Sequence, residues 1–433
     1  MSFTNSLTTD GDRGDPRALC PHLAGYDPLV PEIVADPFPL LSIARVEQPV
    51  FFLEKYDLWV VTRLDDVLAV YKNMDIFSSG SAHQPLMPKP QSVIDRVGEE
   101  WPLPIDGLLN SSDPPLHGTL RRTLLDAFIA AIRNLDPWID QRLEEITNQI
   151  AHKGEADLVS EFAWPLTIST MARLVGAPLT EAGRFKEWAE NWFELTGSSN
   201  LSKERAEACW MGFVDFEEYM TEMIAERRQV PRDDFLSRVI EAQNRGAAIT
   251  DRQIGTNMLG FVAAGTDTTA NTIAQMIHLL LTHPDQLAEV RRDPTLRPAM
   301  IEEVLRMRVP IRGVIRKTTQ ATKLGGVELP EGAHVLIHVG SACRDADKFA
   351  DPEEFNIHRE NLSKHAAFGA GRRMCIGAPL ARKEIAKALD VLLNRFPDLQ
   401  LAPEQGPLRY TSSIIVPSLK SLRITWTPPG PKA

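Results

Sequence analysis

One uninterrupted helical pattern, more than thirty residues long, constrains the fold of this chain most strongly. Thr250-Asp-Arg-Gln253 has the form of a capping box, and the helical pattern then continues to His283-Pro284. At 1.5 Å per residue such a helix is about 50 Å long, which is unusual in a globular protein. Its middle, residues 258–264, is almost entirely apolar and is therefore expected to be buried.

Polar residues interrupt this apolar middle at Ala264-Gly-Thr-Asp-Thr-Thr269. An acid, hydroxyl groups and a glycine inside a buried helix are costly unless they are satisfied or functional. A purely structural explanation is that a hydroxyl bonds the carbonyl one turn earlier and kinks the helix. Such a kink can itself be part of a function.

The second unusual segment is the loop Phe368-Gly-Ala-Gly-Arg-Arg-Met-Cys-Ile-Gly377. Its glycines permit a tight turn and a close approach of the main chain to a flat ligand. From Ile376 onward the pattern is helical. A cysteine just before a helix N-terminus has its thiolate stabilised by amide N–H groups and the helix dipole, which suits a sulfur ligand to a metal. The alternative is a small buried cysteine beside a glycine-rich turn.

The order of residues in this loop resembles the haem-binding loop of cytochromes P450, Phe-x-x-Gly-x-Arg/His-x-Cys-x-Gly. Its fixed positions are filled by Phe368, Gly371, Arg373, Cys375 and Gly377. The interrupted helix resembles the oxygen-activating motif of the same family, Ala/Gly-Gly-x-Asp/Glu-Thr. The resemblance covers about residues 20 to 428, with five motifs in the family's order. It implies a mainly α fold with small β-sheets, in which haem lies between a long central helix and the cysteine loop.

By this resemblance, Cys375 is the thiolate ligand of haem b, and Phe368 shields its sulfur. Gly265 opens the central helix beside the iron, while Asp267 and Thr268 form an acid–alcohol pair. O₂ activation needs protons in a site that excludes bulk water. A hydroxyl can position water there, and a carboxylate that rotates towards solvent can resupply protons. The implied reaction inserts one oxygen atom from O₂ into an organic substrate and releases the other as water.

A third motif is Asp113-Pro-Pro-Leu-His-Gly-Thr-Leu-Arg-Arg122, which begins with a strong helix-start signal. His117 and Arg121 are four residues apart on one helix face. In isolation they are ordinary solvated residues, but the resemblance implies that they bind a haem propionate. The resemblance also assigns cofactor contacts to Arg316, Arg373, Gly371, Gly377 and, just upstream of the cysteine loop, His365.

Glu303-Val-Leu-Arg306 places an acid and a base three residues apart, which alone is a common helical pair worth a few tenths of a kcal/mol. Its place among the other motifs resembles the family's Glu-x-x-Arg pair. That pair stabilises the proximal core together with a later arginine, predicted here to be Arg359. The implied role is structural. Cys343 stands where the family usually has Asn, and we expect only a local change in hydrogen bonding.

Other local patterns predict further elements. Residues 49–62 and 324–330 are typical of hairpins, the second with a Gly-Gly turn, and residues 65–71 of a short helix. Five prolines predict an irregular segment over residues 77–112. Residues 135–228 are predicted to be mostly helical, with breaks at Pro165, Pro178 and Gly197. Residues 410–426 are predicted to form strands.

The whole-chain composition limits the compartment and the partners. The 433 residues are 43% hydrophobic and carry a net charge of −11, which argues against nucleic-acid binding. No apolar run reaches membrane-spanning length, and the polar start is not a signal peptide. Four cysteines without a CxxC pair give no disulfide framework or zinc site. We expect a disordered tail over residues 1–18, a single domain over 19–433, and a soluble, cytoplasmic, monomeric enzyme of bacterial type without a membrane anchor.

No flavin or iron–sulfur segment is recognisable, so we expect the electrons to come from separate proteins. The resemblance implies a [2Fe–2S] ferredoxin and its NAD(P)H-dependent reductase. We predict that a local basic patch attracts an acidic ferredoxin despite the negative total charge. Its residues are Arg122, Lys364, Arg372, Arg382 and Lys383.

The predicted substrate pocket is lined by small or apolar residues, which favours a modest, mainly apolar ligand such as a terpenoid or a substituted aromatic. These residues are Leu259, Gly260, Ala263, Ala264, Ile311, Val314, Ile414 and Ile415. An acidic substrate stays open, because Arg312, Ser78, Ser79 and His83 could bind a carboxylate from loops. The aromatic residues Trp188, Trp192, Phe193, Trp210 and Phe213 are either ordinary core or part of a lid over this pocket.

Three alternatives remain at this point. The first is a haem-thiolate peroxygenase driven by hydrogen peroxide, and the second is a non-catalytic haem-thiolate sensor. Neither needs a proton relay, so the intact Asp267–Thr268 pair argues against both. The third makes Cys375 a nucleophile in a protein without haem, and the absorption spectrum of the reduced, CO-treated protein distinguishes it.

Overall fold

The computed structural model describes residues 17–80, 85, 87–99, 107–197 and 201–428. Residues 1–16 of the predicted tail lie outside the described residues. Contacts with the folded chain already involve Arg17, whose guanidinium carbon lies 5.2 Å from the centroid of the Phe52 ring.

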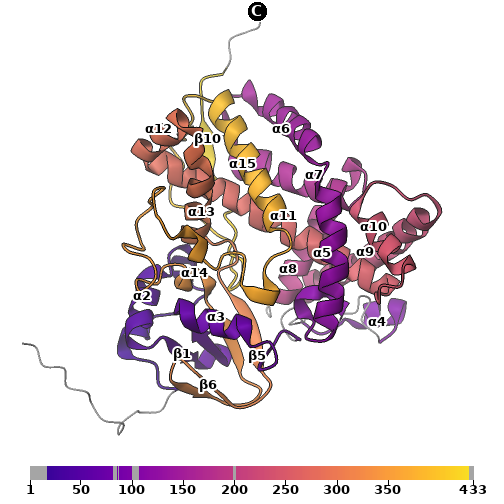
Figure 1. Ribbon diagram of the computed structural model, residues 1–433, viewed down its shortest axis with the longest axis horizontal. Helices are drawn as coiled ribbons and strands as arrows, with labels where there is room; N and C mark the ends of the chain where they lie inside the picture. Colours follow the sequence, from indigo (N-terminus) through magenta and orange to yellow (C-terminus); the bar gives the residue numbers. More distant parts are fainter. Residues whose placement is uncertain (1–16, 81–84, 86, 100–106, 198–200, 429–433) are drawn as a thin grey trace, which may run out of the picture.

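Helices form most of the protein (Figure 1). They are α1 (Pro31–Ala35), α2 (Phe38–Glu47), α3 (Leu64–Lys72), α4 (Gln91–Val97), α5 (Leu116–Ile132), α6 (Asp136–Ala151), α7 (Trp164–Val175), α8 (Ala182–Gly197), α9 (Lys203–Gln229), α10 (Phe235–Asn244), α11 (Asp251–Thr282), α12 (Pro284–Arg292), α13 (Arg297–Met307), α14 (Val339–Ala342) and α15 (Ala378–Arg395).

The predicted central helix is α11, which runs for 32 residues. Thr250 Oγ1 accepts a hydrogen bond from the Gln253 N–H at 3.2 Å, and Gln253 Oε1 accepts one from the Thr250 N–H at 2.9 Å. The capping box is therefore confirmed. Helices α7, α8, α9 and α15 pack around α11, which explains why its middle is apolar.

The largest sheet has five strands in the order β1-β2-β8-β5-β3. These are β1 (Val50–Leu53), β2 (Leu58–Val61), β3 (Phe77–Ser78), β5 (Val314–Thr318) and β8 (His334–Ile337). The β1–β2 hairpin is confirmed, and β2 pairs with β8 in parallel. Val50 and Phe52 pack into one apolar cluster and Phe51 and Leu53 into another. Because both faces are covered, these strands are continuously apolar rather than alternating.

Two smaller sheets complete the β structure of the described residues. One contains β4 (Glu155–Asp157), β10 (Arg423–Thr425) and β9 (Gln400–Leu401), in that order, and the other is the hairpin of β6 (Thr322–Leu324) and β7 (Val327–Leu329). Gly325 and Gly326 connect the hairpin with φ of 55° and 83°. This left-handed backbone is what a two-glycine turn accommodates, so the predicted turn is confirmed.

Three local predictions were wrong, each for a physical reason. Pro90 is the N-cap residue of α4, and Pro165 lies in the first turn of α7, where a missing N–H costs nothing. Prolines therefore start helices at two places where a break or an irregular segment was predicted. Within residues 410–426 only β10 and one bridge, between Tyr410 and Leu419, are extended pairs. There the Ser413 hydroxyl oxygen accepts hydrogen bonds from two backbone N–H groups, which are therefore not available to pair with a neighbouring strand.

The sheet end and the helical end of the molecule meet along α11, and the loop before α15 faces the viewer between α3 and α5 (Figure 1). No helix of the described residues is both long and apolar enough to cross a bilayer.

Candidate active site

The cysteine loop is a tight turn that delivers Cys375 to the start of α15. Gly369 and Gly371 have φ of 72° and 60°, a backbone that other residues rarely adopt. The Cys375 N–H donates to the Phe368 carbonyl at 2.8 Å, which closes the loop. Gly377 is the N-cap residue of α15. The sequence prediction of a cysteine just before a helix is therefore confirmed.

Several groups of this loop and its neighbours act on the Cys375 sulfur. Burial raises the pKa of the thiol, while the N–H groups of Gly377 and Ala378 and the cations Arg121 and Arg382 lower it. The side chain is nevertheless accessible to solvent. A bound metal cation deprotonates a coordinating thiol and so offsets the cost of burial. The residue is exposed and positive charges act on its sulfur, which suits a thiolate ligand.

Four predicted propionate contacts converge from three elements. His117 and Arg121 come from α5, Arg316 from β5, and Arg373 from the cysteine loop. The positive charges of Arg316 and Arg121 both lower the pKa of Arg373. Those of Arg373 and Arg121 lower the pKa of His117. Burial, followed by the Arg316 charge, lowers the pKa of Arg373 to about 10. Burial, followed by the charge of Arg373, lowers that of His117 to about 4. The three arginines bring positive charges together, which is unfavourable unless an anion joins them.

Unsatisfied polar atoms show that these residues fit a carboxylate ligand. His117 Nδ1 and Arg373 Nε are buried and have no hydrogen-bond partner. Buried donors rarely remain unpaired in native proteins. Arg373 Nη2 donates to Asp113 Oδ1 at 2.8 Å, so a single carboxylate of the described residues pairs with this cluster. The propionates of haem would supply the missing acceptors and two negative charges.

The structure gives His365 a different partner from the predicted propionate. Its Nε2 lies 2.9 Å from Glu302 Oε2, and its Nδ1 accepts a hydrogen bond from the Ala367 N–H at 3.2 Å. Glu302 also accepts two hydrogen bonds from Arg382, at 2.6 and 2.8 Å. Both nitrogens of His365 are therefore engaged by protein, so this residue is removed from the cofactor contacts.

On α11, the acid and the alcohol of the motif have separate surroundings. Asp267 is 9% exposed, and Oδ2 accepts a hydrogen bond from the Ser418 hydroxyl. Burial raises the pKa of Asp267 to about 6, against the opposing effect of that hydrogen bond. The Thr268 hydroxyl donates to the Ala264 carbonyl one turn earlier, at 2.7 Å. The helix is α-helical throughout, so the hydroxyl bonds back as predicted without interrupting the helix.

Gly265 has a packing role in the structure. A Cβ atom at this position would lie 2.5 Å from Met171 Sδ on α7. The missing side chain lets α11 and α7 approach closely, and the position of this glycine beside the iron stays a prediction. The neighbouring Ala264 is the accessible residue of the motif, in a stretch of helix that is otherwise largely buried.

Glu303, Arg306 and Arg359 form the predicted triad. Arg306 donates to both carboxylate oxygens of Glu303, at 2.7 and 2.9 Å, and Arg359 Nε lies 3.2 Å from each. Glu303 and Arg306 are fully buried. Arg306 also donates to the Cys343 carbonyl at 3.0 Å, and the Cys343 sulfur accepts a bond from the Ala366 N–H at 3.4 Å. The triad thus ties α13 to the segments before the cysteine loop.

The predicted pocket residues differ in how accessible they are. Leu259 and Ala263 are 0% and 1% exposed, inside the main core. A Cβ atom at Gly260 would lie 2.6 Å from Leu108 Cδ1, so this glycine also serves close packing. The remaining residues are half-buried or exposed, which leaves them accessible to a ligand. They are Ala264, Ile311, Val314, Ile414 and Ile415.

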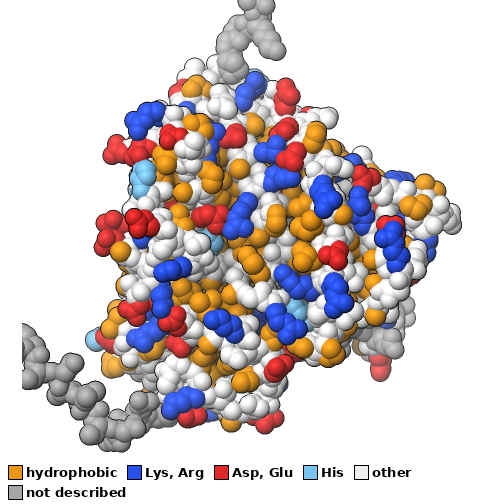
Figure 2. All heavy atoms as spheres, in the orientation of Figure 1, with side chains coloured by type: hydrophobic (Ala, Val, Ile, Leu, Met, Phe, Trp, Pro, Cys, Tyr) orange, Lys and Arg blue, Asp and Glu red, His pale blue; other side chains and the backbone are white. Residues whose placement is uncertain are grey.

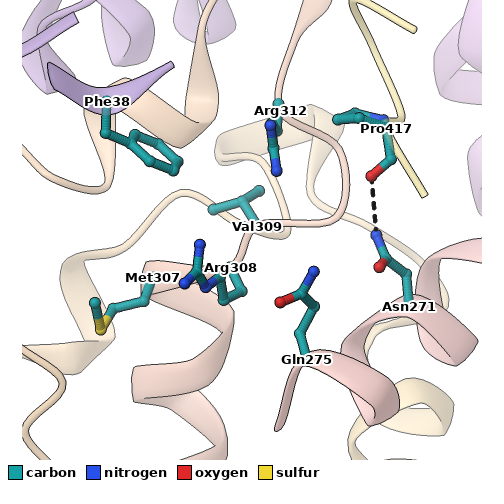
Figure 3. A pocket seen from close by; sticks show the side chains of 8 residues that line it. All are labelled: Phe38, Asn271, Gln275, Met307, Arg308, Val309, Arg312 and Pro417. Carbon is teal, nitrogen blue, oxygen red and sulfur yellow. Dashed lines mark hydrogen bonds between the residues drawn. The ribbon is translucent and has the colours of Figure 1, made fainter. Parts of the chain in front are cut away.

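Arg312 and Ser78, which could have bound an acidic substrate, are engaged elsewhere, whereas the buried Ser79 hydroxyl has no hydrogen-bond partner among the described residues. Arg312 is buried, donates to the Val34 carbonyl, and lies over the Phe38 ring with its guanidinium carbon 5.8 Å from the centroid. It lines a small cavity between α11 and the segment before β5 (Figure 3). Ser78 donates to Asp113. His83 lies outside the described residues.

Four of the five aromatic residues singled out on α8 and α9 are core, whereas Phe193 is half-buried. Trp188, Trp192, Trp210 and Phe213 are each at most 5% exposed. Trp192 and Phe213 form an edge-on pair with centroids 5.8 Å apart. Of the two explanations offered by the sequence, ordinary core is therefore confirmed for these four.

Sequence reasoning missed two residues of the site and one role. Ser418 binds Asp267 from 151 residues away. Glu302 pairs with His365 and Arg382, which come just before and just after the cysteine loop in the chain. Asp113 was recognised only as a helix start, whereas it binds Arg373 and Ser78. No local pattern marks Ser418 or Glu302, because each is identified only by the partner it meets in space.

Comparisons with known proteins agree with this arrangement. The family model described as cytochrome P450 matches residues 193–423. Cytochrome P450 107B1 of Saccharopolyspora erythraea is 35% identical over 85% of this chain and 89% of its own. Nocardicin C N-oxygenase of Nocardia uniformis subsp. tsuyamanensis is 32% identical over 98% of this chain and 100% of its own.

Among solved structures, cytochrome P450 CREJ in complex with (4-ethylphenyl) dihydrogen phosphate superposes with a TM-score of 0.86. It is 29% identical, and the match covers 93% of this chain and 99% of that one. The cysteine loop, the acid–alcohol pair on α11 and these likenesses agree, and the chain belongs to the cytochrome P450 family.

Proposed function

We propose that this P450 monooxygenase oxidises a mainly apolar organic molecule, of the size of a terpenoid or a substituted aromatic, with electrons from a ferredoxin. Haem b on the Cys375 thiolate supplies O₂ binding and O–O cleavage when it is bound. Each turnover consumes one O₂, two electrons and two protons, places one oxygen atom in the substrate and releases one water. The observation that carries the proposal is the placement of Asp267 and Thr268 next to the accessible Ala264 on one buried helix.

The two polar residues of α11 can divide the handling of protons between them. The Thr268 proton is engaged by the Ala264 carbonyl, so its oxygen is left to accept a hydrogen bond from water or from a protonated group. Asp267 has a pKa raised to about 6 by burial, so it can hold and release a proton near neutral pH. Asp267 is therefore the proton source and Thr268 the positioning group.

The accessible side chains favour an apolar substrate. Small or branched apolar surface is offered by the accessible residues Ala264, Ile311, Val314, Ile414 and Ile415. Arg312 is turned away into its own cavity, so it offers no partner to a substrate carboxylate. The aromatic ligand named for the similar CREJ structure supports a substituted aromatic as one member of the class.

The substrate class is tested by titrating terpenes, phenols and benzoates while the haem absorption band is monitored. Ligands that shift the band are then incubated with ferredoxin, reductase, NADH and ¹⁸O₂. We expect one labelled oxygen atom in the product of an apolar ligand. Binding confined to benzoates, or product without the label, would contradict the proposal.

The roles on α11 have a matched control in the same helix. Thr272 Oγ1 bonds the carbonyl one turn earlier at 2.8 Å, as Thr268 does, but Thr272 is 1% exposed. Thr268→Ala should divert electrons from product to hydrogen peroxide, whereas Thr272→Ala should leave this partition unchanged. An equal effect of both substitutions would mean that the hydroxyl of Thr268 serves only the helix.

The proposed ferredoxin surface lies around the cysteine loop. Lysine and arginine side chains gather on the face over α5 and α15 (Figure 2). Arg382 and Lys383 of the predicted patch are paired with Glu302 and Asp136, at 2.6 and 2.7 Å. Within the described residues no carboxylate pairs with the other three, which are all exposed. These are Arg122, Lys364 and Arg372.

Unpaired cations attract an acidic partner more strongly than cations that are already neutralised. The exposed Met374, beside Cys375, adds apolar contact area. Arg372→Glu should slow reduction by an acidic ferredoxin and weaken its dependence on ionic strength. Lys323→Glu, on the β6–β7 hairpin, is the control. If both substitutions slow reduction equally, only the total charge matters and the docking surface lies elsewhere.

A further inference from the structure

The C-terminal segment, residues 410–419, is bound to α11 by a row of polar side chains. Asp267, Asn271 and Gln275 are four residues apart and therefore share one face of the helix. Asn271 donates to the Pro417 carbonyl at 3.3 Å and accepts from the Leu419 N–H at 3.2 Å. Gln275 donates to the Tyr410 hydroxyl at 2.8 Å. Asp267 accepts from Ser418.

Ser418 is held firmly in place beside the acid. Its N–H donates to Thr411 Oγ1 at 2.9 Å, and its carbonyl accepts from the Thr411 N–H at 2.9 Å. The residue is 7% exposed, and within the described residues no lysine or arginine pairs with Asp267. A cationic partner could only donate to the acid. A hydroxyl both donates and accepts, so it can pass a proton on.

A small cavity lies further along the same face of α11 (Figure 3). Asn271, Gln275, Arg308 and Arg312 contribute its polar lining, and Pro417 closes one side. The space open to the centre of a water-sized sphere is about 10 Å³, which accommodates about one water molecule. Gln275 Oε1 is buried without a hydrogen-bond partner. A buried acceptor beside a space of this size is a typical site for an ordered water.

The cavity lies between the neighbours of the acid in the chain and a partly exposed arginine. Asn271 lines the cavity and is four residues from Asp267, about 6 Å along the helix axis, a distance that one bridging water spans. Pro417 lines the cavity and directly precedes Ser418. On the opposite side Arg308 is only half-buried.

We propose that protons reach Asp267 from the side of the C-terminal segment, through the Ser418 hydroxyl and water in the cavity of Asn271, Gln275 and Arg312. In the transfer, Ser418 gives its hydroxyl proton to the Asp267 carboxylate and takes a proton from a water on its other side. One proton moves inward and no electron is transferred. This inference rests on the proposed function, since it assigns the supply route of the acid that the monooxygenase reaction uses.

The test compares two ways of driving the holoenzyme, with styrene as the probe substrate. NADH with ferredoxin and reductase requires protons from the site, whereas hydrogen peroxide brings its own protons and electrons. Ser418→Ala and Gln275→Leu should lower the ratio of NADH-driven to peroxide-driven styrene oxide about tenfold, the effect of losing one hydrogen-bonded relay group. Ser418→Thr keeps a hydroxyl and should retain the ratio.

A second measurement needs no turnover. The infrared band of the protonated Asp267 carboxyl is identified by its absence in Asp267→Asn, and it should shift to higher frequency in Ser418→Ala because the acid loses its partner. An unshifted band, or an unchanged ratio in both Ser418→Ala and Gln275→Leu, overturns the supply route. If Asp267→Asn also leaves the ratio unchanged, the acid has no role in proton delivery and the proposed function itself fails at this residue.

Discussion

Replacing Glu303 with glutamine should destabilise the protein by about 3–5 kcal/mol, the usual cost of breaking a buried ion pair. The carboxylate is fully buried and accepts bonds from Arg306 at 2.7 and 2.9 Å, from Arg359 at 3.2 Å, and from the Asn356 N–H at 3.0 Å. Glutamine keeps the shape of the side chain but removes the charge and one acceptor. Two largely buried guanidinium groups would then share a neutral amide.

The size of the effect on Tm follows from the chain length. An unfolding entropy of about 2.1 cal/mol/K per residue gives about 0.9 kcal/mol/K for 433 residues, so Tm should fall by about 3–6 °C. Thermal unfolding followed by circular dichroism measures this shift. The control is Glu328→Gln, because Glu328 is 75% exposed and pairs with Lys323 at 3.4 Å.

A surface pair of this kind contributes little, so the control should change Tm by less than about 1 °C. A Tm shift of Glu303→Gln no larger than that of Glu328→Gln would refute the stabilising role of the buried carboxylate. In that case the two arginines would be satisfied by the backbone carbonyls they also contact, and the carboxylate would add nothing.

Three further outcomes follow from the structure. Arg373→Met should speed the transfer of haem to apomyoglobin about tenfold, the loss of one charge-assisted hydrogen bond, while Arg245→Met, at the 75% exposed C-cap residue of α10, should not. The pKa of Asp267 is raised from 3.8 to about 6. Between these two pH values the folded state keeps a proton that the unfolded chain releases, so the free energy of unfolding falls as pH rises from 3.8 to about 6. Asp267→Asn should therefore raise Tm by about 3 °C at pH 8 and about half as much at pH 5; an equal gain at both would contradict the shifted pKa. Gly371→Ala, at φ of 60°, should lower Tm by about 1 °C, whereas Gly183→Ala, with open space around it, should not.

Proline shows where sequence reasoning about local structure is limited. Pro90 and Pro165 were both expected to prevent or break a helix, yet each is found where one begins. Proline has no N–H, which is harmful in the interior of a helix and harmless in its first turn. Which of the two applies depends on where the preceding chain packs. That information is not contained in the neighbouring residues.

Functional residues differ in the same way. Cys375 and the Asp267–Thr268 pair stand in short patterns with fixed spacing, so reading the chain was enough to find them. Gly265 lies in one of those patterns as well, but only the structure shows that its missing side chain makes room for Met171. A motif thus identifies a position more reliably than it identifies what that position contacts.

The sequence by itself determined the long buried helix, the cysteine at the start of a second helix, and the family to which both belong, because helix caps, apolar periodicity and motif spacing are local properties. Only the tertiary structure decided the partners of these groups. Asp267 meets Ser418 across 151 residues, and Arg373 meets Asp113 across 260. Hydrogen bonds and burial act over a few ångströms in space, and packing alone determines which distant segments come that close.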